Sequence, residues 1–133
     1  MNKQRYDVNH EEMKTLPYII AVDFDGTLVE DNFPKIGAIK EENWKAMLKA
    51  RENGAKIILW TCRDGKNLRD AVDFCADYGF EFDAINENIK ETQEMFSNDT
   101  RKVYANEYWD DKAIMNFSKY ALSLTRGDGS EMR

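Results

Sequence analysis

Two acidic pairs stand out in the chain, because each lies at the end of a stretch that is predicted to form a β-strand. Asp23 and Asp25 close the apolar run Tyr18–Phe24, and Asp110 and Asp111 follow a later strand. Four carboxylates within several ångströms repel one another by several kcal/mol at an effective dielectric of about 20, so they can share a site only around a cation. Oxygen ligands select a hard ion, and the pattern therefore predicts a Mg²⁺ site.

Polar side chains of other kinds occupy the neighbouring strand ends. Thr61 ends the second apolar run, Lys56–Thr61, and Arg63 follows it at once. Lys102 stands just ahead of a fourth strand, which is predicted around Val103–Trp109. A hydroxyl group and two cations thus join the four carboxylates.

The remaining elements alternate between helix and strand. One helix is predicted over Lys40–Asn53 and ends at Gly54, and a second over Lys66–Tyr78 ends at Gly79. A short third strand is expected near Phe82–Asn86, and a polar connection of about 15 residues without regular structure follows it. The last predicted helix runs over Lys112–Leu124.

This order predicts an α/β fold: a Rossmann-like three-layer sandwich with a mostly parallel central sheet and helices on both faces. Crossover connections between parallel strands are right-handed almost without exception. The carboxyl ends of the strands then open onto one edge, where ligands bind near the switch point in strand order. We therefore expect the acidic pairs, Thr61 and the two cations to converge there.

Length and composition set the limits of the fold and of its partners. With 133 residues, of which 42% are hydrophobic, the chain is expected to form one domain, with residues 1–15 and 126–133 as disordered tails. No stretch reaches the about 20 apolar residues that span a bilayer, and the polar start lacks a signal peptide, which predicts a cytoplasmic protein without a membrane partner. The net charge of −6 argues against binding along a nucleic-acid backbone, but leaves a nucleotide substrate open. Cys62, Cys75 and His10 form no metal-ligand pattern.

The motifs in this order resemble those of a known family. Asp23-Phe24-Asp25-Gly26-Thr27 resembles the DxDx[TV] signature of the haloacid dehalogenase superfamily. Thr61 resembles the second motif of that superfamily, Lys102 the third, and Asp110-Asp111 the acidic fourth. The resemblance covers roughly residues 18–124 and implies a phosphatase that works through an aspartyl-phosphate intermediate.

The resemblance also implies the catalytic roles. Asp23 is expected to be the nucleophile, and Asp25 the acid that protonates the leaving oxygen and the base that then activates water. Thr61 and Lys102 are expected to bind the phosphoryl oxygens of the substrate. Phosphate monoesters are among the slowest compounds to hydrolyse unaided, and accelerations reach about 10²¹-fold.

The expected Mg²⁺ ligands are Asp23, Asp25 through its main-chain carbonyl, and the Asp110-Asp111 pair. Asp110 is expected to bind the ion directly, whereas Asp111 either binds it through water or orients Lys102. Gly26 allows the sharp turn of the motif, and Thr27 is expected to brace the loop.

Two features, Arg63 and the absence of a cap domain, bear on the substrate but leave its identity undecided. Thr61-x-Arg63 resembles the phosphatase domains of polynucleotide kinases, in which the arginine grips phosphate, so a nucleotide or polynucleotide 3′-phosphatase is the alternative function. Arg63 could equally pair with Asp64 or with a helix. The spacing of the motifs leaves no room for a cap domain, and the open site suits a phosphorylated small molecule or nucleotide, an oligonucleotide end, or closure by a second copy of the chain.

Two further classes of function are weaker. A phospho-receiver domain would need an aspartate after the third strand, where this chain has Asn86 and Asn88. A catalytically idle, metal-binding interaction module would show no Mg²⁺-dependent turnover. The asparagines are predicted to be solvated loop residues, with a substrate contact as the alternative. Trp60, like the other tryptophans, is predicted to be a core or site-wall residue rather than a stacking platform.

Overall fold

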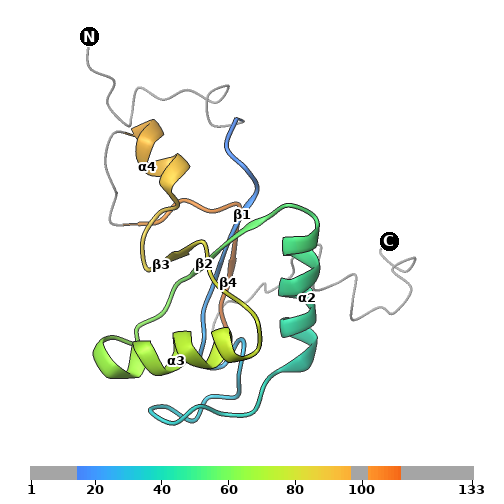
Figure 1. Cartoon of the computed structure of the whole chain (residues 1–133), viewed down its shortest axis with the longest axis vertical. Coiled ribbons are helices and arrows are strands. Elements are labelled where there is room, and N and C mark those ends of the chain that lie inside the picture. Colours follow the sequence, from blue (N-terminus) through green and yellow to red (C-terminus); the bar gives the residue numbers. More distant parts are fainter. Residues whose placement is uncertain (1–14, 97–101, 112–133) are drawn as a thin grey trace.

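The computed structural model describes residues 15–96 and 102–111 of the chain (Figure 1). The predicted helix at 112–124 and both predicted tails, apart from Thr15, lie outside these residues. In chain order the elements are β1 (Ile19–Val22), α2 (Glu41–Glu52), β2 (Lys56–Leu59), α3 (Gly65–Asp77), β3 (Ala84–Ile85), α4 (Lys90–Phe96) and β4 (Glu107–Trp109).

The four strands form one parallel sheet in the order β3-β2-β1-β4. All four residues of β1 are buried, because this strand lies between β2 and β4 with a layer over each face. Val22 at the end of β1 is in register with Leu59 on one side and with Trp109 on the other. The chain moves outward from β1 to β3 and then returns to the far side of β1, so the switch point lies between β1 and β4.

Alternate residues of the strands pack into two separate cores. Ile20 and Val22 face α2 and α3, where they meet Met47 and Ala71. The intervening residues of β1 and β2 face the other way and pack with Ile89, at the start of α4, and with Val103. The predicted α/β sandwich with a parallel sheet is confirmed.

The helices owe their positions to a buried stripe and to charges at their ends. In α2 the buried side chains include Trp44 and Met47, three residues apart, and acidic residues open the helix while basic ones close it, as the helix dipole favours. In α3 Ala71 and Cys75 are buried, four residues apart. Both helices lie within one residue of their predicted bounds.

The segment after β3 differs from the prediction. The polar connection contains the seven-residue helix α4, whose buried residue is Thr92; a helix this short, without an apolar stripe, leaves little periodicity in the sequence. The fourth strand begins at Glu107 rather than near Val103. Residues 103–105 instead cover the second core, and the buried Asn88 side chain accepts a hydrogen bond from the Tyr104 main chain (2.6 Å). Asn88 is therefore a structural residue, and its predicted role as a solvated loop residue is wrong.

The connections around the carboxyl edge of the sheet are short. A single loop joins β1 to α2, and five residues join β2 to α3. Within the described part of the chain, neither connection holds a cap domain. None of the described helices has the length and apolar character that crossing a membrane requires.

Candidate active site

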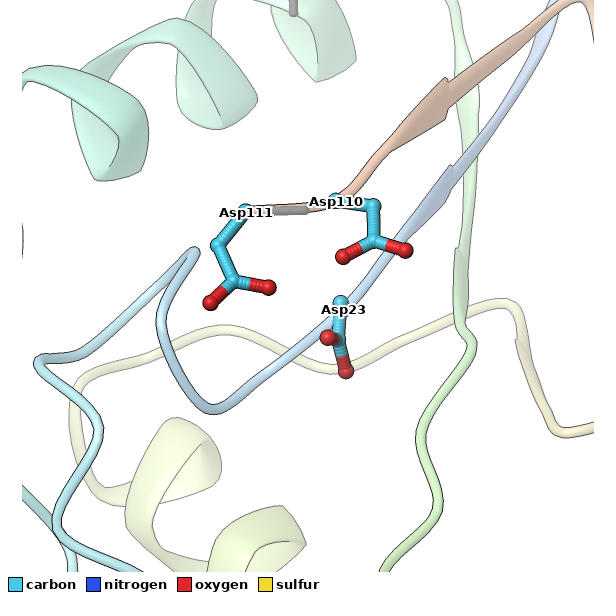
Figure 2. Close-up of side chains that lie close together, drawn as sticks. All are labelled: Asp23, Asp110 and Asp111. Carbon is cyan, nitrogen blue, oxygen red and sulfur yellow. The ribbon is translucent and has the colours of Figure 1, made fainter. Parts of the chain in front are cut away.

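Three carboxylates meet at the switch point of the sheet (Figure 2). Asp23 follows β1, and Asp110 and Asp111 follow the adjacent β4; one oxygen from each lies within 4.8 Å of the others. The Asp23 main-chain N–H donates to the Trp109 carbonyl (2.9 Å), which continues the strand pairing as far as the acidic residues. Parallel pairing of these two strands therefore brings together residues that are almost ninety positions apart in the chain.

The acidic cluster changes the proton affinity of its most enclosed member. Burial first, and then the charges of Asp110, Asp111 and Asp25, raise the pKa of Asp23 from 3.8 to about 6, against a hydrogen bond from the Phe24 N–H (2.8 Å) that lowers it. At an effective dielectric of about 20, two charges about 5 Å apart repel by about 3 kcal/mol. Without a cation, the ionised carboxylates of this cluster would therefore repel one another strongly.

The donor set fits a hard divalent cation. It offers carboxylate oxygens from Asp23, Asp110 and Asp111, and two of these side chains are exposed enough for an ion to keep several waters. Mg²⁺ is commonly held by a few carboxylates and retained waters in this way.

Gly26 allows the loop after β1 to pass close to the cluster. Its φ is +87°, and a Cβ atom there would overlap the carboxylate of Asp111. Two side chains from the start of α2 hold the same loop: Lys40 Nζ donates to the Gly26 carbonyl (3.0 Å), and Asn43 Nδ2 donates to the Thr27 carbonyl (2.8 Å). Lys40 and Asn43 were not among the predicted site residues, because nothing in the sequence indicates that they reach back by 14 and 16 residues.

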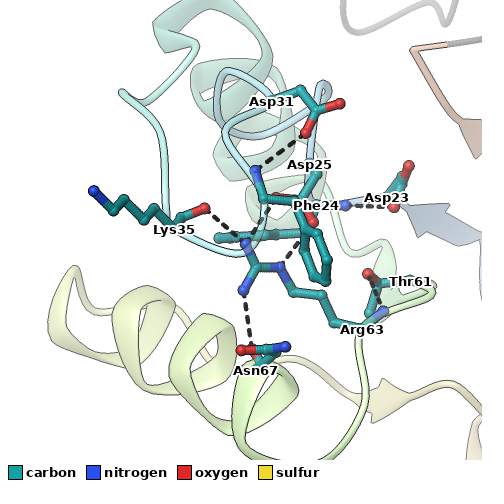
Figure 3. A network of polar contacts seen from close by, with 9 residues as sticks. Asp23, Phe24, Asp25, Asp31, Lys35, Thr61, Arg63 and Asn67 are labelled. Carbon is teal, nitrogen blue, oxygen red and sulfur yellow. Dashed lines mark hydrogen bonds and ion pairs between the residues drawn. The ribbon is translucent and has the colours of Figure 1, made fainter.

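The carboxylate of Asp25 points away from the cluster and is bound by Arg63 (Figure 3). Arg63 Nε donates to Asp25 Oδ2 (2.7 Å), and its Nη2 donates to Asp25 Oδ1 (2.8 Å). The guanidinium also donates to the carbonyls of Lys35 (3.0 Å) and Asn67 (3.1 Å). Arg63 is only 3% exposed, so this cation is enclosed by protein groups.

Aromatic rings complete the enclosure of Arg63. The rings of Phe24 and Phe33 each lie 5.1 Å from the guanidinium carbon, within the range of a cation–π contact. The hydrogen bonds to Asp25 raise the pKa of Arg63. For this residue the predictions were a phosphate contact, or a pair with Asp64 or with a helix. In the structure Arg63 pairs with Asp25, and it also binds a carbonyl of α3, that of Asn67.

Thr61 reaches the site from β2. Its main-chain N–H donates to the side-chain oxygen of Asn86 (2.8 Å), and its hydroxyl oxygen accepts from the Arg63 main chain (3.1 Å). Asn86 has a φ of +55° just after β3, so its side chain bridges two strand ends and is more than a solvated loop residue. Thr61, Asp23 and Asp110 line one pocket of about 470 Å³.

Lys102 lies ahead of β4 with an exposed side chain. Its ammonium group is 5.7 Å from the ring centre of Tyr108, and Tyr108 lines the same pocket as Asp23. The structure thus brings Asp23, Asp110, Asp111 and Thr61 together, sets Lys102 beside the ring of Tyr108, and turns the carboxylate of Asp25 towards Arg63.

Comparisons with known proteins identify the family of the chain. Residues 20–126 match the model of a family described as haloacid dehalogenase-like hydrolase. A solved structure of a conserved protein from Bacteroides thetaiotaomicron is similar to the chain, with 30% sequence identity and a TM-score of 0.67 over 81% of this chain and 88% of that one. No curated protein matches the sequence.

Proposed function

The chain belongs to the haloacid dehalogenase-like hydrolases, and on this basis we propose that it is a Mg²⁺-dependent phosphatase that hydrolyses phosphate monoesters through an aspartyl-phosphate on Asp23. One observation carries the proposal: the three carboxylates within 4.8 Å of one another lie beside Thr61 at the edge of a parallel sheet. An acidic cluster with a hydroxyl donor beside it suits a phosphoryl group bound against a cation.

Asp23, Asp110 and Asp111 would hold the metal. When bound, Mg²⁺ would neutralise the repulsion among these carboxylates and the negative charge of the phosphoryl oxygens. It would also favour the ionised form of Asp23, whose pKa burial raises to about 6.

The covalent steps are assigned to the Asp23-x-Asp25 pair. An Asp23 oxygen attacks phosphorus, the bond from phosphorus to the leaving oxygen breaks, and Asp25 gives its proton to that oxygen. Asp25 then takes a proton from water as the water oxygen attacks phosphorus, and the bond to Asp23 breaks to release phosphate. Because both Asp25 oxygens accept hydrogen bonds from Arg63, the Asp25 side chain must first rotate towards Asp23 and take up a proton from water before it can act as the acid.

Thr61 and Lys102 would stabilise the negative charge on the phosphoryl oxygens. The Thr61 hydroxyl accepts from the Arg63 main chain, so its own proton is available to a phosphoryl oxygen. The ammonium of Lys102, next to the pocket-lining ring of Tyr108, would supply positive charge from the β4 side. Asp111 orients Lys102 if it does not itself bind the ion.

The alternative, a polynucleotide 3′-phosphatase, rested on a phosphate contact by Arg63. Four hydrogen bonds from that buried guanidinium to protein groups speak against such a contact. We therefore propose a phosphorylated small molecule or nucleotide as the substrate and the cytoplasm as the location. Nothing in the described loops forms a cap domain, so we propose that the substrate, or a second copy of the chain, covers the site.

A substrate panel tests the function. Phosphate release is measured with sugar phosphates, nucleotides and 3′-phosphorylated oligonucleotides, with Mg²⁺ and with a chelator. Asp23→Asn should lower turnover at least about 10³-fold, as loss of a nucleophile does elsewhere. Asp77→Asn, the same change at an exposed carboxylate of α3, should leave turnover unaltered. After acid quenching, phosphate should remain bound to the wild-type protein and to Asp77→Asn, but not to Asp23→Asn. If Mg²⁺-dependent turnover does not exceed that of the Asp23→Asn blank, an idle binding module is favoured.

A further inference from the structure

The pocket beside the acidic cluster has aromatic walls. Its volume is about 470 Å³, within the range of small-molecule sites. Asp23, Asp110, Thr61 and Asn86 supply its polar lining, and the other lining residues are Trp60, Tyr108, Trp109, Ala21 and Cys62. A group that leaves from phosphorus on Asp23 would therefore have aromatic side chains within the same pocket.

Strand register explains why these side chains meet. Ala21 is paired with Tyr108 on β4, and Val22 is paired with Leu59 on β2, which sets Trp60 beside Asp23. The Trp60 N–H donates to the Val22 carbonyl (2.8 Å), so the pairing continues to this residue. In-register residues of parallel strands point to the same face. Trp60 and Tyr108 thus lie diagonally on either side of the strand that carries Asp23: Trp60 is level with Asp23, and Tyr108 is level with the small side chain of Ala21.

Their spacing suits an inserted ring. Two strand spacings, roughly 10 Å, separate β2 from β4, and Trp60 and Tyr108 are also offset by two residues, roughly 7 Å, along the strands. Stacked or edge-on aromatic pairs have centroids about 4.5–7 Å apart, so a flat group that lies diagonally between the two side chains can contact both.

Both rings are accessible, and one is fixed in place. Trp60 is 37% exposed, whereas Trp44 and Trp109 are 8% and 6% exposed. Tyr108 is 36% exposed, and its hydroxyl donates to the Val103 carbonyl (2.6 Å) and accepts from the Ala105 N–H (3.1 Å). A ring anchored in this way loses little conformational freedom when a ligand stacks on it.

We propose that Trp60 and Tyr108 form a leaving-group site for phosphate monoesters that carry a flat aromatic or heteroaromatic ring, such as aryl or nucleoside monophosphates. This inference rests on the proposed phosphatase function. Trp60 was predicted to be a core or site-wall residue rather than a stacking platform, and it does line the site; the proposal adds a stacking role, because the sequence shows a tryptophan at a strand end but not that it is exposed beside Asp23. The net charge of −6 favours a single small ester over an oligonucleotide.

Matched esters test the inference. Benzyl phosphate and cyclohexylmethyl phosphate have similar size and alcohols of similar acidity, but only the first has a flat ring. In the wild type we expect kcat/KM for the benzyl ester to be the higher. Trp60→Ala should reduce that preference by about 5- to 150-fold, the range that loss of one stacking contact gives. Trp60→Phe should restore most of it, and Trp60→Leu should not.

Two further comparisons make the result specific. Adenosine 5′-monophosphate carries a base where ribose 5-phosphate carries the C1 hydroxyl, so a larger preference in this pair than in the benzyl pair would identify a nucleoside rather than an aryl group. Tyr78→Ala removes an aromatic side chain that is 59% exposed and lies outside this pocket, and it should leave both preferences unchanged.

Failure of the two proposals can be told apart. If both members of each pair are hydrolysed equally and Trp60→Ala changes them equally, the leaving-group site is overturned and the phosphatase function stands. If no ester is hydrolysed, the function fails, and calorimetric titration of Asp23→Asn with benzyl phosphate decides the site. The leaving-group site is overturned if benzyl phosphate binds no more tightly than cyclohexylmethyl phosphate, or if Trp60→Ala does not affect its binding in the Asp23→Asn background.

Discussion

The buried pair of Arg63 and Asp25 should be one of the strongest single interactions in the fold. The Arg63 side chain is 1% exposed and that of Asp25 is 17% exposed. Arg63→Met would remove four hydrogen bonds and leave a carboxylate and two carbonyl oxygens without their donor (Figure 3). Breaking a buried ion pair from one side costs about 3–5 kcal/mol, and we expect a loss of this size in the free energy of unfolding. That is a large part of the roughly 5–15 kcal/mol that stabilises a domain.

Urea unfolding of a double-mutant cycle measures the interaction itself. Arg63→Met, Asp25→Asn and the double variant should give a coupling free energy of about 2–3 kcal/mol, because the second substitution removes the charge that the first leaves unpaired. The control is Lys66 and Asp70 on α3, whose side chains are 77% and 44% exposed at 2.9 Å. Exposed pairs with this spacing on a helix contribute about 0.3–0.5 kcal/mol.

A coupling no larger than that of the control would refute the reasoning. Arg63 would then not be committed to Asp25, and the phosphate contact predicted from Thr61-x-Arg63 would become the better hypothesis. Arg63→Lys adds a check on geometry: a lysine keeps the charge but cannot form the two-pronged contact, so its stability should lie between those of the wild type and Arg63→Met.

Three further predictions concern the acidic cluster. Gly26→Ala should lower stability by about 1–3 kcal/mol and weaken Mg²⁺ binding, both through strain and through overlap with Asp111. The control is Gly79→Ala, because Gly79 has a similar φ of +84° but open space around it. This variant should cost less in urea unfolding and leave Mg²⁺ titrations unchanged. Since the pKa of Asp23 is raised to about 6, its contribution to stability without divalent ions is full below pH 3.8 and is lost as the pH rises through 6. Asp23 is only half-buried, so the loss relative to Asp23→Asn should be about 1–2 kcal/mol, and parallel pH profiles of the two proteins would contradict it. Mg²⁺ at about 100 times its Kd should add about 2.7 kcal/mol to the free energy of unfolding, seen as a rise in Tm that Asp110→Asn abolishes; an equal rise in that variant would place the ion elsewhere.

The fold was largely predictable because its signals are local. A continuous apolar run such as Ile19–Val22 has only one stable setting in a protein of this size, between two strands and two covering layers. The buried stripes of α2 and α3 repeat at helical spacing, and each helix is followed by a glycine with positive φ. By contrast, α4 is a short polar helix, and the residue that packs against the strands, Ile89, precedes it, so its sequence carries no such signal.

The site divides in the same way. That the ends of β1 and β4 meet follows from strand order, and the acidic residues at those ends could be found by reading the residues after each strand. The direction in which each side chain points could not be predicted from the sequence. Asp25 and Arg63 are 38 residues apart, and their pairing depends on the course of the loop that also presents the Lys35 carbonyl. The exposure of Trp60 likewise depends on how its neighbours in the fold are arranged, which no local sequence pattern indicates.

The edge position of β4 in the described sheet gives the acidic cluster a particular thermodynamic character. This strand has three residues and pairs with β1 alone, yet it carries Asp110 and Asp111 towards Asp23. Pairing of the strands therefore works against repulsion of about 3 kcal/mol for each close pair of charges, and the hydrogen bonds between Asn106 and Ile19 help to hold the strand in place. Any cation that offsets the repulsion must, by linkage, also strengthen the docking of β4. Because Tyr108 lies on the same strand, binding of the metal and the shape of the aromatic pocket are coupled through one short element.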